Sequence, residues 1–383
     1  MKNLQPEFNG LGYLELRPLF KNKPGHRFSM PKGLPELPRP IPIQVVNDEP
    51  DTEKETELVN VRRLRSPLTG KGFCAVVIDS GVFEHEFLRG NIRQRLSTNG
   101  NETDINDHYG HGTHMAGIIA ASNSEISSIG IAPGAGIISI KVTNEKSGSA
   151  SWKAIYKALV HTLAMVKKES NNELKIGVVN ISFNGLDAKT DDSDIGNHKI
   201  AQIINELSEH DIPVVVSAGN AFGYKNKDGL GYPAFHPSVI AAGAHGNFRL
   251  NNLPYHSIAP YSQRYLSSDL FKPLSGMKKV NSSLIYAPGL FSVSLNNSND
   301  ATKQFSVKSG TSVSAAVISG TILLMQEKWN SIHSGRMPLT EIRSKLKAGC
   351  EIFQNVSSAI VPTRTYDFRH YTKINIFKTL NLI

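Results

Sequence analysis

The stretch FCAVVIDSG, residues 73–81, places a continuous apolar run directly before an aspartate and a turn glycine. Three other runs, at 136–142, 176–182 and 212–220, are equally apolar and rich in β-branched residues. Such runs are typical of strands that are buried on both faces of a parallel sheet. These segments therefore predict strands of one parallel sheet.

Helical patterns separate the apolar runs. Residues 151–168 carry apolar side chains at helical spacing with lysines between them, and residues 200–210 show a similar pattern. The alternation of strand and helix predicts an α/β fold with a doubly wound, mostly parallel sheet and helices on both faces. In sheets of this type the chemistry lies at the carboxyl ends of the strands.

The composition is that of a soluble globular protein with a sizeable core, since 39% of the 383 residues are hydrophobic and 20% are charged. The formal net charge is +9, but the basic residues are scattered, so nucleic acid is not an expected partner. No segment approaches the roughly 18 continuous apolar residues of a membrane span, so no membrane partner is expected. The oligomeric state stays open.

Two features predict a cytoplasmic location. The first residues, MKNLQPEFNG, lack the apolar stretch of a secretory signal. The two cysteines, Cys74 and Cys350, do not indicate a disulfide framework, which fits a reducing compartment. Export by a route that leaves no such signal stays open.

Residues 1–70 differ from the rest of the chain. They contain the proline-rich stretch MPKGLPELPRPIPIQ and the charged stretch NDEPDTEKETE. Proline fixes φ and removes a hydrogen-bond donor, so this part predicts an extended arm or linker, with a pro-segment role left open. The main domain is expected from residue 71 onward.

Three residues supply the parts of a nucleophilic site. Asp79 follows a strand, His111 begins a helical pattern after a polar loop, and Ser312 lies at the start of an apolar helix. A nucleophilic serine needs an imidazole to take its proton, and the imidazole needs a carboxylate to fix its tautomer. Asn220, at another strand end, offers an amide to an oxyanion. Taken singly, these positions also suit turn residues and a helix N-cap.

A metal site is the alternative interpretation of HYGHGTHMAGIIAA, residues 108–121. There His108, His111 and His114 recur every three residues. Catalytic zinc usually takes three protein ligands plus water, and pairs on a helix favour an i, i+4 spacing. The spacing here is i, i+3, so no metal ligands are predicted.

Four motifs in chain order resemble those of one family. VVIDSGV, GHGTHMAGIIAA, SAGN and SGTSVSAAVISG are similar to the aspartate, histidine, oxyanion-asparagine and serine motifs of the subtilisin-like serine proteases, the subtilases of peptidase family S8. The resemblance covers residues 71–383. It implies a serine endopeptidase that forms an acyl-enzyme, with Asp79, His111, Ser312 and Asn220 as the catalytic residues. His114 resembles the family's second, structural histidine.

The chain also departs from the family pattern. Ala316 stands where the family usually has proline, and Val313 where it usually has methionine. Residues 247–285 are longer than the corresponding stretch of the family, and we expect a surface insertion near the cleft.

The resemblance further implies that a peptide substrate binds as an added strand between two segments. Asn184 lies in one of them, where the family commonly has glycine, so its side chain either narrows the pocket, offers a polar contact or merely turns the chain. The implied substrate-binding residues are Ser182, Phe183 and Asn184 on one side, Lys146, Ser147 and Gly148 on the other, and Ser217, Ala218, Gly219 and Gly231 on the far wall.

Many family members need calcium, which prefers six to eight oxygen ligands. The resemblance places a calcium loop at 123–125, but Phe87 stands where an aspartate is expected, so no tight calcium site and no cofactor are predicted. Two rival functions stay open: a peptide transferase or macrocyclase on the same fold, and a non-catalytic peptide-binding relative of the proteases.

Overall fold

The computed structural model describes residues 67–122, 130–144, 148–169, 175–185, 188–189, 198–222, 229–250, 253–265, 284–290, 292–354 and 370–383. Most of the predicted arm, residues 1–66, lies outside these ranges. So do residues 251–252 and 266–283 of the predicted insertion.

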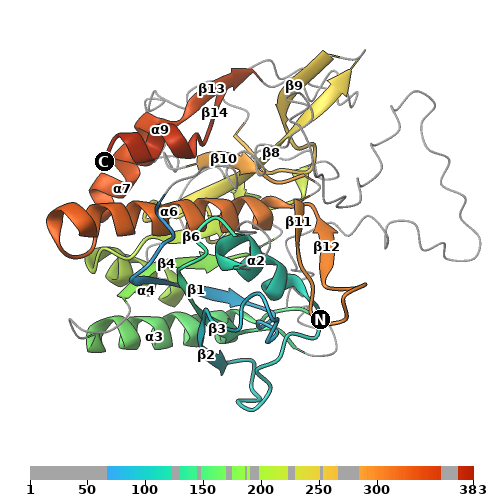
Figure 1. Ribbon diagram of the computed structural model, residues 1–383, viewed down its shortest axis with the longest axis vertical. Coiled ribbons are helices and arrows are strands. Elements are labelled where there is room, and N and C mark those ends of the chain that lie inside the picture. Colours follow the sequence, from blue (N-terminus) through green and yellow to red (C-terminus); the bar gives the residue numbers. More distant parts are fainter. Residues whose placement is uncertain are drawn as a thin grey trace, which may run out of the picture.

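One large sheet runs through the described part of the chain (Figure 1). Its strand order is β13-β14-β10-β8-β6-β4-β1-β3-β2, and β9 pairs with β8. The β8–β9 and β13–β14 pairs are antiparallel, while the other neighbouring pairs are parallel. The strands are β1 (Phe73–Asp79), β2 (Ile92–Ser97), β3 (Gly136–Lys141), β4 (Lys175–Ile181), β6 (Val214–Ser217), β8 (Val239–Leu250), β9 (Leu253–Ile258), β10 (Leu284–Pro288), β13 (Glu351–Gln354) and β14 (His370–Lys373).

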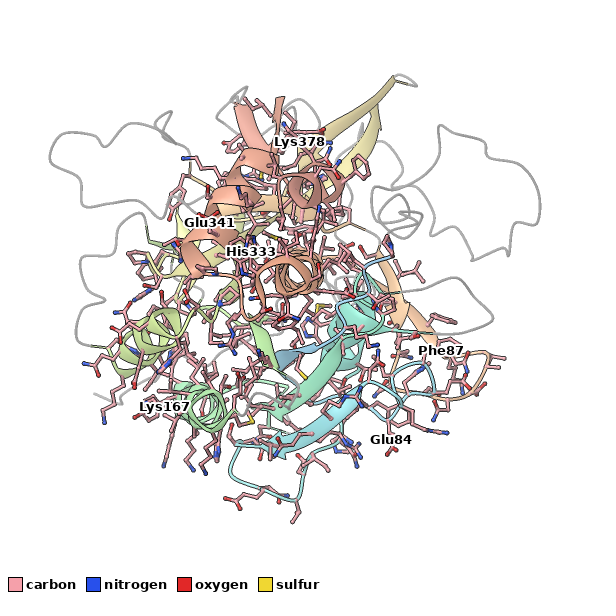
Figure 2. The ribbon with its side chains drawn as sticks, turned by 60° about the vertical axis from the view of Figure 1, so that its left-hand side comes forward. Glu84, Phe87, Lys167, His333, Glu341 and Lys378 are labelled. Carbon is pink, nitrogen blue, oxygen red and sulfur yellow. The ribbon has the colours of Figure 1, made fainter. Side chains whose placement is uncertain are left out.

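Helices cover both faces of this sheet, as the sequence predicts. Figure 2, which labels Lys167 of α3 and His333 of α6, shows these two helices on opposite sides of the strands. The helices are α2 (His111–Ala120), α3 (Trp152–Lys168), α4 (Lys199–Glu209), α6 (Thr311–His333), α7 (Leu339–Gly349) and α9 (Ile376–Asn381). None of the helices in the described ranges is both long enough and apolar enough to span a membrane.

Strand β1 shows why a continuous apolar run was needed. Successive side chains of a strand point to opposite faces, so a strand covered on both faces must be apolar throughout. Ala75 and Val77 pack into the core beneath α2, α6, α7 and α9. Val76 and Ile78 pack into a second core beneath α3 and α4. Asp79, a buried residue that belongs to neither core, ends the strand.

The part of the predicted insertion that the structure describes extends the sheet. β8 and β9 form an antiparallel hairpin in which Leu250 pairs with Leu253, so the first residues of the 247–285 segment continue a core strand. Two smaller antiparallel pairs flank the sheet: β11 (Ser292–Leu295) with β12 (Phe305–Lys308), and β5 (Ala188–Lys189) with β7 (Leu230–Gly231).

The start of the described chain is anchored to α6. The backbone N–H groups of Thr69 and Gly70 both donate to Glu327 Oε2 at 2.6 Å. Gly134 N–H donates to the Thr69 carbonyl at 2.7 Å. Residues 69–70 are therefore fixed against the later turns of α6.

Candidate active site

Asp79 and His111 form a buried pair at the carboxyl end of β1. His111 Nδ1 lies 2.7 Å from Asp79 Oδ1, and both side chains are fully shielded from solvent. The same carboxylate oxygen also accepts a hydrogen bond of 2.7 Å from Ser80 N–H. Asp79 ends a strand and His111 begins α2, so two rigid elements bring the groups together.

A short set of contacts holds the loop after β1 against the start of α2. Gly112 N–H donates to Ser80 Oγ at 2.9 Å, and Phe83 N–H donates to Thr113 Oγ1 at 2.9 Å. A Cβ on Gly112 would lie 2.0 Å from the Gly81 carbonyl oxygen. Only glycine allows this close approach, which sets the position of His111 relative to Asp79.

Asp107 is a further buried carboxylate that the sequence analysis did not single out. It accepts hydrogen bonds from Ser80 Oγ at 2.8 Å, from Gly110 N–H at 2.8 Å and from Thr113 Oγ1 at 2.6 Å. Burial raises its pKa and the nearby Asp79 charge adds to the rise, while the hydrogen bonds from Thr113 and Ser80 oppose it. A signal was available, because an acidic residue just before a helix start suits the N-terminal end of the helix dipole.

Ser312 lies in the first turn of α6, which packs against α2. Its Oγ donates to the Ser182 carbonyl oxygen at 3.3 Å. Both helices begin at the same end of the sheet (Figure 1), so their first turns bring Ser312 and His111 to one region.

Asn220 is oriented by the residue before Ser312. Its Oδ1 accepts hydrogen bonds from Thr311 N–H and Thr311 Oγ1, each at 3.0 Å. A backbone N–H can only donate, so the carbonyl oxygen of the amide must face Thr311 and Nδ2 lies on the other side. Gly219 N–H also donates to Thr311 Oγ1 at 3.2 Å, which ties the strand end after β6 to the start of α6.

The residues predicted to bind substrate fall into three groups. Asn184 and Ser217 are in contact, since Asn184 Nδ2 donates to Ser217 Oγ at 2.9 Å, and the Ser182 carbonyl accepts from Ser312 Oγ. Gly231 N–H donates to the Ala218 carbonyl at 3.0 Å and thereby joins the same wall. The Phe183 side chain is fully buried in the core beneath α3 and α4, so this residue offers the site only its backbone.

The segment at 146–148 is only partly described. Lys146 and Ser147 lie outside the described residues. Gly148 is buried at φ 63°, and its N–H donates to the Asn144 carbonyl at 3.0 Å. The proposed second rim is therefore placed only through this turn.

The three histidines of the 108–121 stretch have separate surroundings. His108 Nε2 lies 3.2 Å from Asp104 Oδ1, whereas His114 Nε2 lies 3.2 Å from the Ser292 and Ser306 carbonyls. Burial lowers the pKa of His114 well below its usual range, and the positive charge of Lys308 acts in the same direction. Within the described ranges, no group of three or more His, Cys, Asp or Glu side chains is arranged to hold a metal ion.

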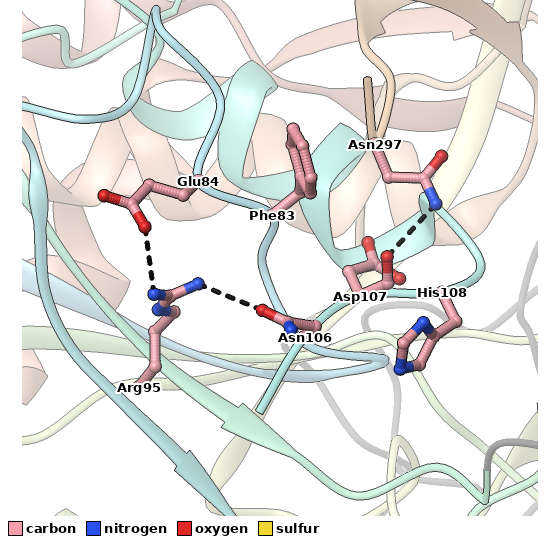
Figure 3. A pocket seen from close by; sticks show the side chains of 7 residues that line it. All are labelled: Phe83, Glu84, Arg95, Asn106, Asp107, His108 and Asn297. Carbon is pink, nitrogen blue, oxygen red and sulfur yellow. Dashed lines mark hydrogen bonds and ion pairs between the residues drawn. The ribbon is translucent and has the colours of Figure 1, made fainter. Parts of the chain in front are cut away.

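A pocket of about 440 Å³ borders the start of α2 (Figure 3). Arg95 links its two sides through Glu84 at 3.1 Å and Asn106 at 3.3 Å, and Asn297 Nδ2 donates to the Asp107 carbonyl at 3.1 Å. Its lining residues are Phe83, Glu84, Arg95, Asn106, Asp107, His108 and Asn297.

A model of the subtilase family matches residues 70–350 of the chain. The chain is a member of the subtilase family. It is 27% identical to alkaline elastase YaB from Bacillus sp. (strain YaB) over 317 residues, which cover 80% of this chain and 68% of that protein. It is 29% identical to subtilisin Savinase from Lederbergia lenta over 283 residues, which cover 73% of this chain and 84% of that protein. The solved structure of Sphericase is similar with a TM-score of 0.60 and 25% identity, covering 76% of this chain and 88% of that one.

Family membership confirms two sequence-based predictions. The fold is the α/β fold of the subtilases, and the protein is a serine-type endopeptidase whose substrates are polypeptides. Two departures from the family pattern leave the fold intact. Ala316 and Val313 are fully buried in α6, and the helix is continuous from Thr311 to His333 without the usual proline.

Proposed function

We propose that this subtilase hydrolyses peptide bonds through Asp79, His111 and Ser312. The observation that carries the proposal is the buried 2.7 Å contact between His111 Nδ1 and Asp79 Oδ1. A carboxylate at Nδ1 fixes the tautomer in which Nε2 accepts a proton. In the proposed first step, Ser312 Oγ transfers its proton to His111 Nε2 and attacks the substrate carbonyl carbon.

The negative charge that develops on the substrate oxygen needs donors that are already in place. We assign this role to Asn220 Nδ2 and to the Ser312 backbone N–H. The two hydrogen bonds from Thr311 to Asn220 Oδ1 support the assignment, because they fix the amide before substrate arrives.

The remaining steps use the same groups. His111 gives its proton to the leaving amine, which leaves an ester between Ser312 Oγ and the substrate acyl group. Water then loses a proton to His111, attacks the ester and releases Ser312. The buried Asp79–His111 pair supports catalysis rather than passive peptide binding, because a peptide-binding module needs no buried general base.

The substrate is proposed to lie beside two segments. One contains Ser182, whose carbonyl already faces Ser312 Oγ, and the other contains Gly148. Side chains of the substrate would then enter the space bordered by Ser217–Gly219 and Gly231. This arrangement is strand addition, in which main-chain hydrogen bonds give affinity and side-chain pockets give specificity.

These steps need only groups of the protein and water, so we propose that catalysis uses no metal or cofactor. We also propose that the protein works in the cytoplasm. Both cysteines are free thiols, and burial raises the pKa of Cys74 to about 11 and that of Cys350 to about 12. Thiols of this kind are unreactive and suit a reducing compartment. Fractionation of the source cells, with the protein detected by antibody, tests the location.

The experiment for the catalytic proposal is labelling with a fluorophosphonate probe. We expect one label per molecule on Ser312, located by peptide mapping, and loss of peptidase activity as the label accumulates. The matched control is Ser331→Ala, an exposed serine near the other end of α6, which should label as the wild type does. Equal labelling of folded Ser312→Ala, or none of the wild type, would contradict the assignment.

A further inference from the structure

Asn184 spans the space between two walls of the candidate site. Its Nδ2 donates to Ser217 Oγ at 2.9 Å and reaches the Ser217 carbonyl at 3.4 Å. A Cβ placed on Gly231 would lie 3.0 Å from Asn184 Cβ, and one placed on Gly219 would lie 3.4 Å from Asn184 Oδ1. Asn184 is only 8% exposed. The Asn184 side chain therefore contacts Ser217 directly and lies next to the backbone of Gly219 and Gly231.

The same space should receive a substrate side chain. Ser182 O contacts the Ser312 hydroxyl, and Gly219 and Asn220 are joined to Thr311. The residue whose carbonyl Ser312 attacks must place that carbonyl oxygen at Asn220. In the proposed mechanism its Cα lies beside the Ser182 carbonyl and the Gly219–Asn220 backbone, so its side chain extends next to Asn184, which donates to Ser217.

The far wall is held in place. Gln263 N–H donates to the Gly219 carbonyl at 2.8 Å, and Gln263 Cγ lies 2.8 Å from the position of a Cβ on Gly219. Gln263 is itself anchored, since its Nε2 donates to the Gly229 carbonyl at 3.0 Å. The wall therefore cannot retreat from a large side chain without breaking contacts on its other side.

We propose that Asn184 is a specificity-determining residue that restricts the residue on the acyl side of the cleaved bond to glycine, alanine or serine. The inference rests on the proposed function and adds the class of bond to it. A larger side chain would have to displace a buried amide from its hydrogen bonds, and buried polar groups that lose their partners discriminate strongly.

The test uses the full chain and peptide p-nitroanilides that differ only in this residue. We expect wild-type kcat/KM for alanine to exceed that for phenylalanine at least tenfold. Asn184→Gly should raise the phenylalanine-to-alanine ratio by roughly 10²-fold, since a single methylene in a pocket already changes discrimination by about 10- to 200-fold. Asn184→Ala should also raise the phenylalanine-to-alanine ratio, but by less. This variant replaces Asn184→Gly in the test if the glycine variant does not fold.

The matched control is Asn91→Ala. Asn91 Nδ2 also donates to two carbonyls, those of Ala120 and Pro133, but at the opposite end of α2 from His111. This variant should leave the ratio unchanged. A wild-type preference for phenylalanine, an unchanged ratio in folded Asn184→Gly, or an equal change in Asn91→Ala would each overturn the inference.

Fluorophosphonate labelling separates this inference from the proposed function. If Ser312 is labelled and bonds after phenylalanine are cut well, the inference fails and the triad stands. If Ser312 is not labelled, both fail.

Discussion

The side of the site that carries Asp79 and His111 is built differently from the side that borders Asn184. The first is a closed set of polar contacts in which Asp107, Ser80 and Thr113 hold the start of α2. The second is a space between backbone segments in which the Asn184 side chain donates a hydrogen bond to Ser217. The difference separates two tasks. Many buried contacts hold the catalytic groups in place, whereas a single residue, Asn184, limits the space for the substrate side chain.

The strongest test of the chemical side is Ser312→Ala. kcat should fall roughly 10⁶-fold, which is the loss measured when the nucleophile of subtilisin is removed. Folding should persist, because alanine suits a buried helix start. Steady-state kinetics and thermal melting check both expectations. A folded variant with comparable peptidase activity would show that Ser312 is not the nucleophile.

The next effect in size is expected from Asn220→Ala. The oxyanion exists only near the transition state, so kcat should fall far more than KM rises. The subtilisin asparagine gives the scale, about 10²–10³ in kcat. A change mainly in KM would show that Asn220 contacts the bound substrate and does not stabilise the oxyanion.

The pH dependence of stability tests the closed side without substrate. His114 has a pKa well below 6.5 in the folded state, chiefly because it is buried. Below about pH 6.5 the unfolded chain therefore binds a proton that the folded chain does not. The free energy of unfolding then decreases as the pH is lowered, by at most about 1.4 kcal/mol per pH unit. Above about pH 6.5 this loss of stability is absent.

We expect His114→Gln to flatten this slope between pH 7 and 5, measured by calorimetry in the Ser312→Ala background to prevent self-digestion. Burial also lowers the pKa of His85, so part of the slope should stay. His161→Gln, an exposed position on α3, is the control. An identical slope in both variants would show that His114 does not drive the acid sensitivity.

The smallest expected effect is that of a calcium chelator. Phe87, at the position where the family suggests an aspartate, packs against His85 and Phe305 with ring centroids 5.2 and 5.8 Å away. An aromatic ring offers no ligand for calcium, while the loop at 123–125 lies outside the described residues. The melting temperature should shift by less than about 2 °C, since a tightly bound ion would contribute several times more. A larger drop would reveal a calcium site.

The sequence was sufficient for elements with strong local patterns. The β1 run predicted a strand buried on both faces, and Ser151, which caps α3 through Ala154 N–H, follows ordinary helix rules. Asp79 ends β1 as predicted, whereas Asn220 lies three residues beyond Ser217, where β6 ends. Both lie at the edge of the sheet where the carboxyl ends of its parallel strands gather.

Other features depend on contacts between distant segments. The place of Asp107 before a helix is visible in the sequence, but its hydrogen bond from Ser80 forms only when the loop after β1 folds onto α2. The Asn184–Ser217 bond joins segments that no local pattern relates. Residues 247–285 are expected to form a surface insertion, because this stretch is long, polar and broken by proline; its first described residues instead pair locally in the β8–β9 hairpin.

The hydrogen bonds from Thr69 and Gly70 to Glu327 determine whether the protein could cleave its own chain near Thr69 within one molecule or only in a second molecule. Glu327 lies about 22 Å along α6 from Ser312, because a helix rises about 1.5 Å per residue. A bond held there cannot reach the nucleophile of its own molecule. Cleavage beside Thr69 would therefore be bimolecular, with a rate that rises with the square of protein concentration, unless the hydrogen bonds from Thr69 and Gly70 to Glu327 break first.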